Sequence, residues 1–200
     1  MRRLSIVLIP VVLAVALVAA FYIWRASDSV PALGRNVQTG TAQIGGPFTL
    51  TDQNGMKRSS SDFRGRFMLI YFGYSFCPDV CPTTLSLMAD ALDKVGPKAD
   101  RVVPVFITID PERDTPAKLK PYTASFGPRF VGLTGDLASI KTVAGLYRVY
   151  IKKVPLDGGG YGMDHSSVIY LMGPDGKFVT YWDDTSIGPD RLAAEIRARL

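Results

Sequence analysis

Hydrophobic residues along this chain fall into two recurring patterns, one typical of buried strands and the other of helices. Residues 67–72 and 102–109 are almost continuously apolar, as strands are when both of their faces are buried. Between them, residues 82–95 carry apolar side chains at helical spacing, and Gly96 with Pro97 ends that pattern. Such an alternation of buried strands and helices predicts a sheet with helices packed on both faces.

The alternation continues to the C-terminus. We expect a helix to begin at Pro116 with Thr115 as its N-cap, because proline is favoured in the first turn. Residues 173–176 read Gly-Pro-Asp-Gly, which predicts a β-hairpin turn between two late strands. The expected strands are 47–51, 130–133, 167–172 and 178–182, and the remaining helices are 116–126, 137–147 and 189–200. The predicted fold class is α/β, with three layers, a central mostly parallel sheet and an added β-hairpin.

The N-terminal segment has a different pattern. Residues 4–24 carry no charge, and 21 helical residues span about 31 Å, which is enough to cross the hydrocarbon core of a membrane. Two arginines precede this run and one follows it, which favours an internal N-terminus and an exported domain. A signal peptide cleaved near Ala14-Val15-Ala16 is the alternative. We therefore predict a transmembrane anchor over residues 1–25, a tether over 26–43 and a folded domain over 44–200.

The charge of the chain argues against nucleic-acid binding. The formal net charge is +5, but Arg2, Arg3 and Arg25 belong to the N-terminal segment. Without these three, the chain has 20 basic and 18 acidic residues. Such a nearly even balance of charge predicts no basic surface for nucleic acid. The hydrophobic fraction of 47% is that of an ordinary globular protein, so the fold needs no disulfide framework.

Two cysteines and one histidine are the candidate ligands for a soft metal ion. Cys77 and Cys81 stand four residues apart, and His165 is the only histidine of the chain. Two thiolates with one imidazole suit Cu(I) or zinc. The cysteine pair alone would also serve as a redox couple. In an oxidising compartment a structural disulfide is the third interpretation.

The predicted position of the cysteines favours a functional pair. Cys77 follows the strand at 67–72 by a short loop, and Cys81 lies at the start of the next helix. Ligands usually bind at this carboxyl edge of a parallel sheet. The amide hydrogens and the positive dipole end of a helix N-terminus also stabilise a thiolate. We therefore predict an accessible and activated pair; if residues 77–81 are helical, both sulfurs lie on one face of the helix.

Four charged residues are candidates for supporting the metal site. Asp79 lies between the cysteines, Asp110 and Arg113 follow the strand at 102–109, and Asp164 precedes His165. An Asp110–Arg113 pair would brace the loop near the site, although a helix-entry loop explains both residues without a function. Asp164 would supply an oxygen to a zinc ion. Asp79 would orient an amide or face a partner, and a solvated acid is an equally good interpretation.

Three motifs occur in a fixed order along the chain. They are residues 73–85, Gly-Tyr-Ser-Phe-Cys-Pro-Asp-Val-Cys-Pro-Thr-Thr-Leu; residues 109–116, Ile-Asp-Pro-Glu-Arg-Asp-Thr-Pro; and Asp164-His165-Ser166. Together they resemble the Sco/SenC family of copper chaperones over roughly residues 40–200. The resemblance implies a thioredoxin-like domain that binds one copper ion through Cys77, Cys81 and His165. It also implies a role in assembling the dinuclear copper centre of cytochrome c oxidase subunit II.

The resemblance carries further expectations. It implies copper as Cu(I), with Cu(II) as a second candidate state, and a metallochaperone rather than an enzyme. Other periplasmic copper chaperones or thioredoxin-like reductants are the further partners we expect. The expected location is a bacterial inner membrane with the domain in the periplasm; the alternative is a mitochondrial inner membrane, facing the intermembrane space. The competing function is a thiol–disulfide oxidoreductase that keeps partner cysteines reduced, which requires Cys77 and Cys81 but not His165.

Overall fold

The computed structural model describes residue 18 and residues 43–200. The predicted anchor and tether therefore lie almost wholly outside the described residues. Within the described part, no helix is both long enough and apolar enough to cross a membrane. Residues 43–200 form one compact unit, and it is described by itself below.

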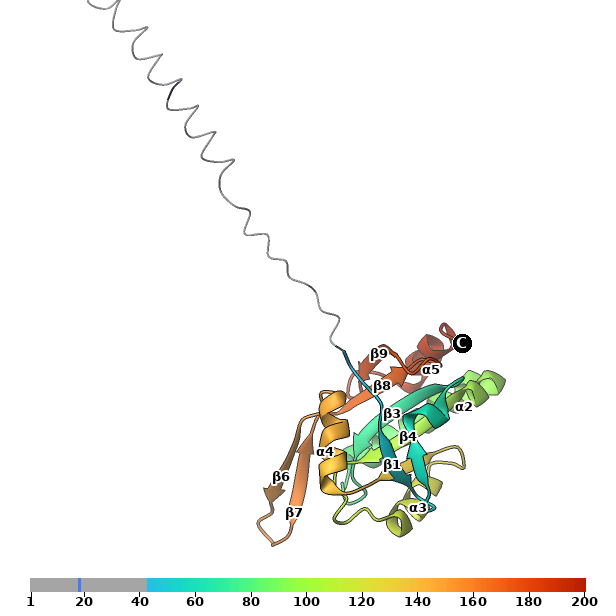
Figure 1. The fold of residues 1–200 in the computed structure, drawn as a ribbon. Coiled ribbons are helices and arrows are strands. Elements are labelled where there is room, and N and C mark those ends of the chain that lie inside the picture. The colour runs from blue at the N-terminus through green and yellow to red at the C-terminus, as the bar shows by residue number, and fades with distance from the viewer. Residues whose placement is uncertain (1–17, 19–42) are drawn as a thin grey trace, which may run out of the picture. The chain divides into compact units, whose positions relative to one another are not determined.

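A seven-stranded sheet forms the centre of this unit, with the strand order β2-β1-β5-β4-β3-β8-β9 (Figure 1). Its strands are β1 (Thr49–Asp52), β2 (Lys57–Ser59), β3 (Phe67–Gly73), β4 (Val102–Thr108), β5 (Val131–Thr134), β8 (Val168–Met172) and β9 (Phe178–Asp183). Every residue of β3 and β4 is buried, as the continuous apolar runs predicted. The hairpin predicted from the Gly-Pro-Asp-Gly turn is present as β8 and β9.

The prediction of a mostly parallel sheet is wrong, because the sheet is mixed. Only β3 with β4 and β4 with β5 are parallel. The other four pairings are antiparallel, including β3 with β8. A strand–helix–strand unit produces a parallel pair, but β8 follows a hairpin instead of a helix, so that argument does not apply to it.

Helices cover both faces of the sheet, which confirms the three layers. They are α2 (Val80–Val95), α3 (Pro116–Ala124), α4 (Leu137–Leu146) and α5 (Pro189–Arg197), with short 3-10 helices η1 (Ser60–Phe63) and η2 (Gly96–Arg101). Neighbouring residues of a strand point to opposite faces. On one face, Phe106 of β4 contacts Tyr122 of α3 with ring centroids 5.4 Å apart. On the other, Phe72 of β3 contacts Tyr147 at the end of α4 at 5.2 Å. Helix α5 packs against α2.

A second, two-stranded sheet was not predicted. It is a hairpin of β6 (Ile151–Pro155) and β7 (Tyr161–His165), which lies beside α4 in Figure 1. Gly159 and Gly160 in its turn have φ of 87° and 80°, a conformation that favours glycine. The sequence indicated only a glycine-rich loop here, because the two strands lack an apolar run. His165 is the last residue of β7, so this hairpin carries the candidate histidine.

Candidate metal centre

The antiparallel pairing of β8 with β3 brings His165 to the cysteines. Tyr71 of β3 pairs with Ile169 of β8, so the start of β8 lies beside the end of β3. Cys77 and Cys81 follow the end of β3, whereas His165 directly precedes the start of β8. The register of one strand pair therefore joins two parts of the chain that are 84 residues apart.

Cys81 and His165 are in direct contact. The Cys81 Sγ atom lies 3.6 Å from His165 Nε2. On the other side of the ring, His165 Nδ1 lies 2.9 Å from the carbonyl oxygen of Ser166. Because a carbonyl can only accept, Nδ1 carries the hydrogen, and the lone pair of Nε2 faces the sulfur. Sulfur and nitrogen ligands of one ion lie roughly 3.6–3.8 Å apart, so the pair is spaced as two ligands of one ion would be.

Cys81 differs from the prediction of an accessible, activated thiol. Its side chain is fully buried, and burial raises the pKa of this thiol to about 12. Burial outweighs the backbone hydrogen bond with Tyr74, which favours the thiolate. Gly73 allows this burial, since a Cβ atom there would lie 2.9 Å from the Cys81 sulfur. The thiol of Cys81 must therefore lose its proton when a metal binds.

Cys77 is half-buried and fits the prediction better. Its Sγ atom accepts a hydrogen bond of 3.4 Å from the amide of Cys81, in the first turn of α2. Among residues 43–200, no three cysteine, histidine or acidic side chains are gathered tightly enough to hold a metal ion. A three-ligand site would thus require the three donor atoms to draw closer together. Besides burial, the nearby Cys77 thiol raises the pKa of Cys81.

A buried polar network beneath Cys81 was missed by sequence reasoning. The Tyr71 hydroxyl lies 4.0 Å from the Cys81 sulfur and 3.1 Å from Ser167 Oγ. Ser167 and Thr84 both donate to Asp184, at 2.9 and 2.5 Å. Burial raises the pKa of Tyr71, so the phenol is neutral. No motif in the sequence links these residues, because they come from β3, α2 and both ends of the β8–β9 hairpin.

Two predicted supporting residues, Asp79 and Asp164, are exposed. Asp79 occupies the N-cap position of α2, but its side chain makes no capping hydrogen bond. Asp164 lies opposite Lys152 in the hairpin and, as the neighbour of His165 in a strand, it points to the other face. The structure therefore gives neither carboxylate a contact with the Cys81–His165 pair.

The other two predicted supporting residues form the expected pair. Arg113 Nε is bonded to Asp110, and the Asp110 side chain is only 3% exposed. Arg113 also donates from Nη1 to the carbonyl of Tyr161 in the hairpin, at 3.0 Å. Nearby, the buried Asp114 accepts from the amide of Ser75 at 3.0 Å and from Thr108 Oγ1 at 2.6 Å, which fixes the loop that leads to Cys77. Burial raises the pKa of Asp114.

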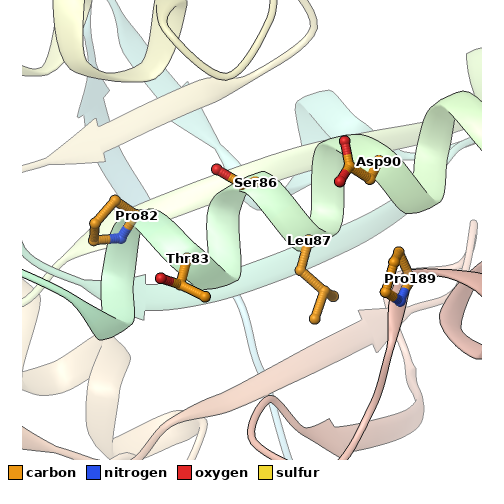
Figure 2. Close-up of a pocket in the computed structure, with 6 residues that line it drawn as sticks. All are labelled: Pro82, Thr83, Ser86, Leu87, Asp90 and Pro189. Atoms are coloured by element: carbon orange, nitrogen blue, oxygen red, sulfur yellow. The ribbon is translucent and has the colours of Figure 1, made fainter.

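A groove of about 430 Å³ lies along α2, next to the site but separate from it. Figure 2 shows Pro82, Thr83, Ser86, Leu87 and Asp90 along the helix, with Pro189 of another segment facing them. The groove begins one residue after Cys81 but contains neither cysteine nor His165. Its only charged group is one carboxylate, so it does not have the donor set of a soft-metal site.

Comparison with known proteins agrees with the three motifs. The SCO1/SenC family model matches residues 36–200. The chain belongs to the SCO1/SenC family. The copper-bound structure of ScoI from Bradyrhizobium japonicum is 49% identical, covers 78% of this chain and 99% of its own, and superposes with a TM-score of 0.73. BsSco, described as a Sco-family cytochrome c oxidase assembly protein with a disulfide switch, is 27% identical and has a TM-score of 0.63, with 78% and 91% covered.

The plant and human mitochondrial relatives of this SCO1/SenC chain are longer proteins. The human mitochondrial SCO1 homologue is 40% identical over 170 residues, which are 83% of this chain and 54% of the human protein. This chain spans between 51% and 62% of the plant and human mitochondrial relatives. The copper-bound ScoI structure, in contrast, is matched over almost its whole length, so the thioredoxin-like Sco domain is the shared part.

Proposed function

We propose that this protein is a copper chaperone that binds one copper ion through Cys77, Cys81 and His165. The observation that carries the proposal is the 3.6 Å contact between Cys81 Sγ and the lone-pair nitrogen of His165, with the Cys77 sulfur bonded to the Cys81 amide. Two thiolates and an imidazole form a soft donor set that suits Cu(I). The family relatives from Bradyrhizobium japonicum and Arabidopsis thaliana with copper bound support copper as the cargo.

A three-ligand shell fits delivery better than storage. A structural zinc site normally has four protein ligands, whereas three ligands leave a position that a recipient's ligand can attack. Cys77 is half-buried whereas Cys81 is fully buried, so of the two sulfurs Cys77 is the one that we expect to release the metal first. Cu(I) is the proposed state, and Cu(II) remains a candidate that the same imidazole would also bind.

We propose subunit II of cytochrome c oxidase as the recipient and residues 4–24 as the anchor in a bacterial inner membrane. The oxidase is supported by the family relative BsSco, which is described as an oxidase assembly protein. The anchor is supported by the uncharged run at the start of the chain. Periplasmic copper chaperones as donors and thioredoxin-like reductants of the cysteines complete the proposed set of partners.

Copper titration of the reduced full chain tests the chaperone proposal. We expect one Cu(I) per chain in competition with a chromophoric chelator, and an affinity at least about 100-fold lower after His165→Ala. Cys77→Ser and Cys81→Ser should each abolish tight binding. Asp164→Asn is the matched control, because Asp164 neighbours His165 but points away, and it should change the affinity less than twofold. Binding that is unaltered by His165→Ala would overturn the three-ligand site.

A second candidate function is thiol–disulfide exchange with a partner's cysteines. It is supported by two neighbouring free cysteines, with the Cys77 sulfur bonded to the Cys81 amide, and by the disulfide switch described for BsSco. This activity would require both sulfurs but not the imidazole. A disulfide-reduction assay on an oxidised recipient peptide separates the two functions: His165→Ala should preserve the reduction of the peptide and lose copper delivery to it.

A further inference from the structure

The β6–β7 hairpin depends on side chains for its position. Within residues 43–200 it shares no backbone pairing with the seven-stranded sheet. Its apolar contact with the rest of the domain is also incomplete, because Ile151 and Met163 line a cavity of about 200 Å³ together with Ile109 and Ile140. Ile151 and Met163 do pack against the core, but this partial packing leaves polar side chains to fix the hairpin against the cysteine loop.

The Arg113 guanidinium occupies the junction between the hairpin and the cysteine loop. Its central carbon lies 3.8 Å from the centre of the Tyr161 ring, which belongs to the hairpin. The same carbon lies 4.8 Å from the Phe76 ring and 5.6 Å from the Tyr74 ring, which belong to the segment just before Cys77. One cation thus packs among three aromatic rings from two segments, an arrangement that attracts more strongly when it is shielded from water.

Polar contacts fix the orientation of this guanidinium. Arg113 Nε is bonded to the buried Asp110, and Nη1 donates to the Tyr161 carbonyl at 3.0 Å. The Tyr161 hydroxyl donates to Asp110 at 3.0 Å, which closes a ring of three residues. Arg113 Nη2 is buried without a hydrogen-bond partner among the described residues, a cost that the stacking and the ion pair must offset.

The two segments that Arg113 joins each carry a candidate ligand. Phe76 directly precedes Cys77, and Tyr161 lies in the strand that ends at His165. The Tyr74 ring also meets the His165 ring edge to face, with centroids 6.2 Å apart. We propose that Arg113 is a positioning residue that holds the cysteine loop and the hairpin together, so that His165 meets the sulfur ligands. The metal part of this inference rests on the proposed copper site.

Lysine is not expected to replace Arg113. A lysine would keep the positive charge beside Asp110, but it lacks the planar fork that stacks on rings and bonds in two directions at once. Arg113→Lys therefore removes the positioning contacts but keeps a positive charge beside the buried Asp110 carboxylate. Arg113→Gln alone would leave the Asp110 carboxylate buried and unpaired. The second test variant is therefore the Asp110→Asn/Arg113→Gln double variant, which has no buried unpaired charge.

A copper-free measurement tests the positioning directly. The chain has one histidine, so in the full chain in detergent, labelled with ¹³C-histidine, every imidazole signal belongs to His165. In the wild type we expect a ring-current-shifted signal and a nuclear Overhauser contact with the Tyr74 ring. Both should be lost or weakened at least twofold in Arg113→Lys. An unchanged signal and contact in a folded Arg113→Lys and in the double variant would overturn the proposal.

Copper affinity then tests whether Arg113 acts through His165. Arg113→Lys should weaken Cu(I) binding roughly 10- to 100-fold, as supporting residues of metal sites do. In a His165→Ala background the same change should have less than a twofold effect, because the ligand being positioned is gone. Equal losses in both backgrounds would show a general structural role and overturn the inference.

A control variant and the copper-free signals separate the failure of this inference from that of the proposed function. Arg129→Lys makes the same chemical change at an arginine that pairs with Asp93 at the opposite edge of the sheet, and it should alter neither readout. If the wild-type chain bound no Cu(I), the copper site would be wrong, but the imidazole signals would still decide whether Arg113 positions His165.

Discussion

The seven-stranded sheet and the β6–β7 hairpin supply different parts of the candidate metal centre and are held in different ways. The sheet is joined by backbone pairing from end to end, and its central strands β3 and β4 are buried throughout. The hairpin is joined to the rest of the domain by side chains such as Arg113 and Lys153. The difference teaches that the sheet provides most of the stability, whereas the hairpin provides one metal ligand and little stability, so substitutions in the two regions should change stability to different extents.

The largest loss of stability is expected in the sheet. Phe72 is 1% exposed and its ring contacts Tyr147 and Tyr170. Phe72→Ala should lower the free energy of unfolding by about 3–5 kcal/mol, because it removes buried contacts and leaves a cavity. Urea unfolding measures this loss. Val179→Ala, on the exposed edge strand β9, is the control and should cost less than about 1 kcal/mol; similar losses for both would contradict the assignment of stability to the central strands.

A smaller loss is expected at the β1–β2 turn, at the edge of the same sheet. Asp52 accepts hydrogen bonds of 2.9 Å from the amides of Asn54 and Met56, and its other oxygen is bonded to Arg58. Burial of the carboxyl opposes ionisation, but these amides and the Arg58 charge outweigh it and lower the pKa of Asp52. Asp52→Asn should cost about 1–3 kcal/mol at pH 7.

The loss at Asp52 should depend on pH. A carboxyl whose pKa is lower in the folded state stabilises the fold above its unfolded pKa, and this contribution disappears as the pH falls through the folded pKa. Urea unfolding at pH 7 and near pH 3 should therefore show a gap between wild type and Asp52→Asn that narrows in acid. Asn54→Ala provides the control, because it removes an exposed side chain that does not titrate and keeps the backbone amide that bonds Asp52, so its gap should not change with pH. A gap that widens in acid would contradict the lowered pKa.

The smallest effect is expected in the middle of β6. Lys153 pairs with Glu112 at 2.7 Å, and both side chains are about half exposed. The hydrogen bond from Lys153 and the lysine charge lower the pKa of Glu112, but solvent screens the pair. Lys153→Gln should leave the urea midpoint of the full chain unchanged within error. A clear shift of the midpoint would show that the hairpin contributes to global stability and would weaken the contrast between the two regions.

Much of the sheet could be predicted from the sequence, because buried strands and amphipathic helices leave local patterns. The runs at 67–72 and 102–109 and the Thr115-Pro116 start of α3 were all found in this way. The hairpin could not be found, since residues 151–155 and 161–165 contain lysines, a proline and a glycine in place of an apolar alternation. Their position against the rest of the domain is set by residues far away in the chain, such as Arg113.

The candidate metal centre also has parts that the sequence predicted and parts that it did not. The position of Cys77 and Cys81 after a buried strand followed from local order, and the motifs pointed to His165. The burial of Cys81 and the network through Tyr71 and Ser167 could not be predicted, because both depend on the antiparallel register of β8 on β3. With the mostly parallel sheet that we expected, nothing in the chain order would have placed the start of β8 beside the end of β3.

X-ray absorption at the copper edge of the Cu(I)-loaded full chain tests the central claim most directly, because it counts the ligands that the two regions supply. We predict a three-coordinate ion with two sulfur neighbours, from Cys77 and Cys81, and one nitrogen neighbour from His165. In His165→Ala the nitrogen should disappear while both sulfurs remain. A spectrum with sulfur neighbours only, and unchanged by His165→Ala, would contradict a metal centre shared between the sheet and the hairpin.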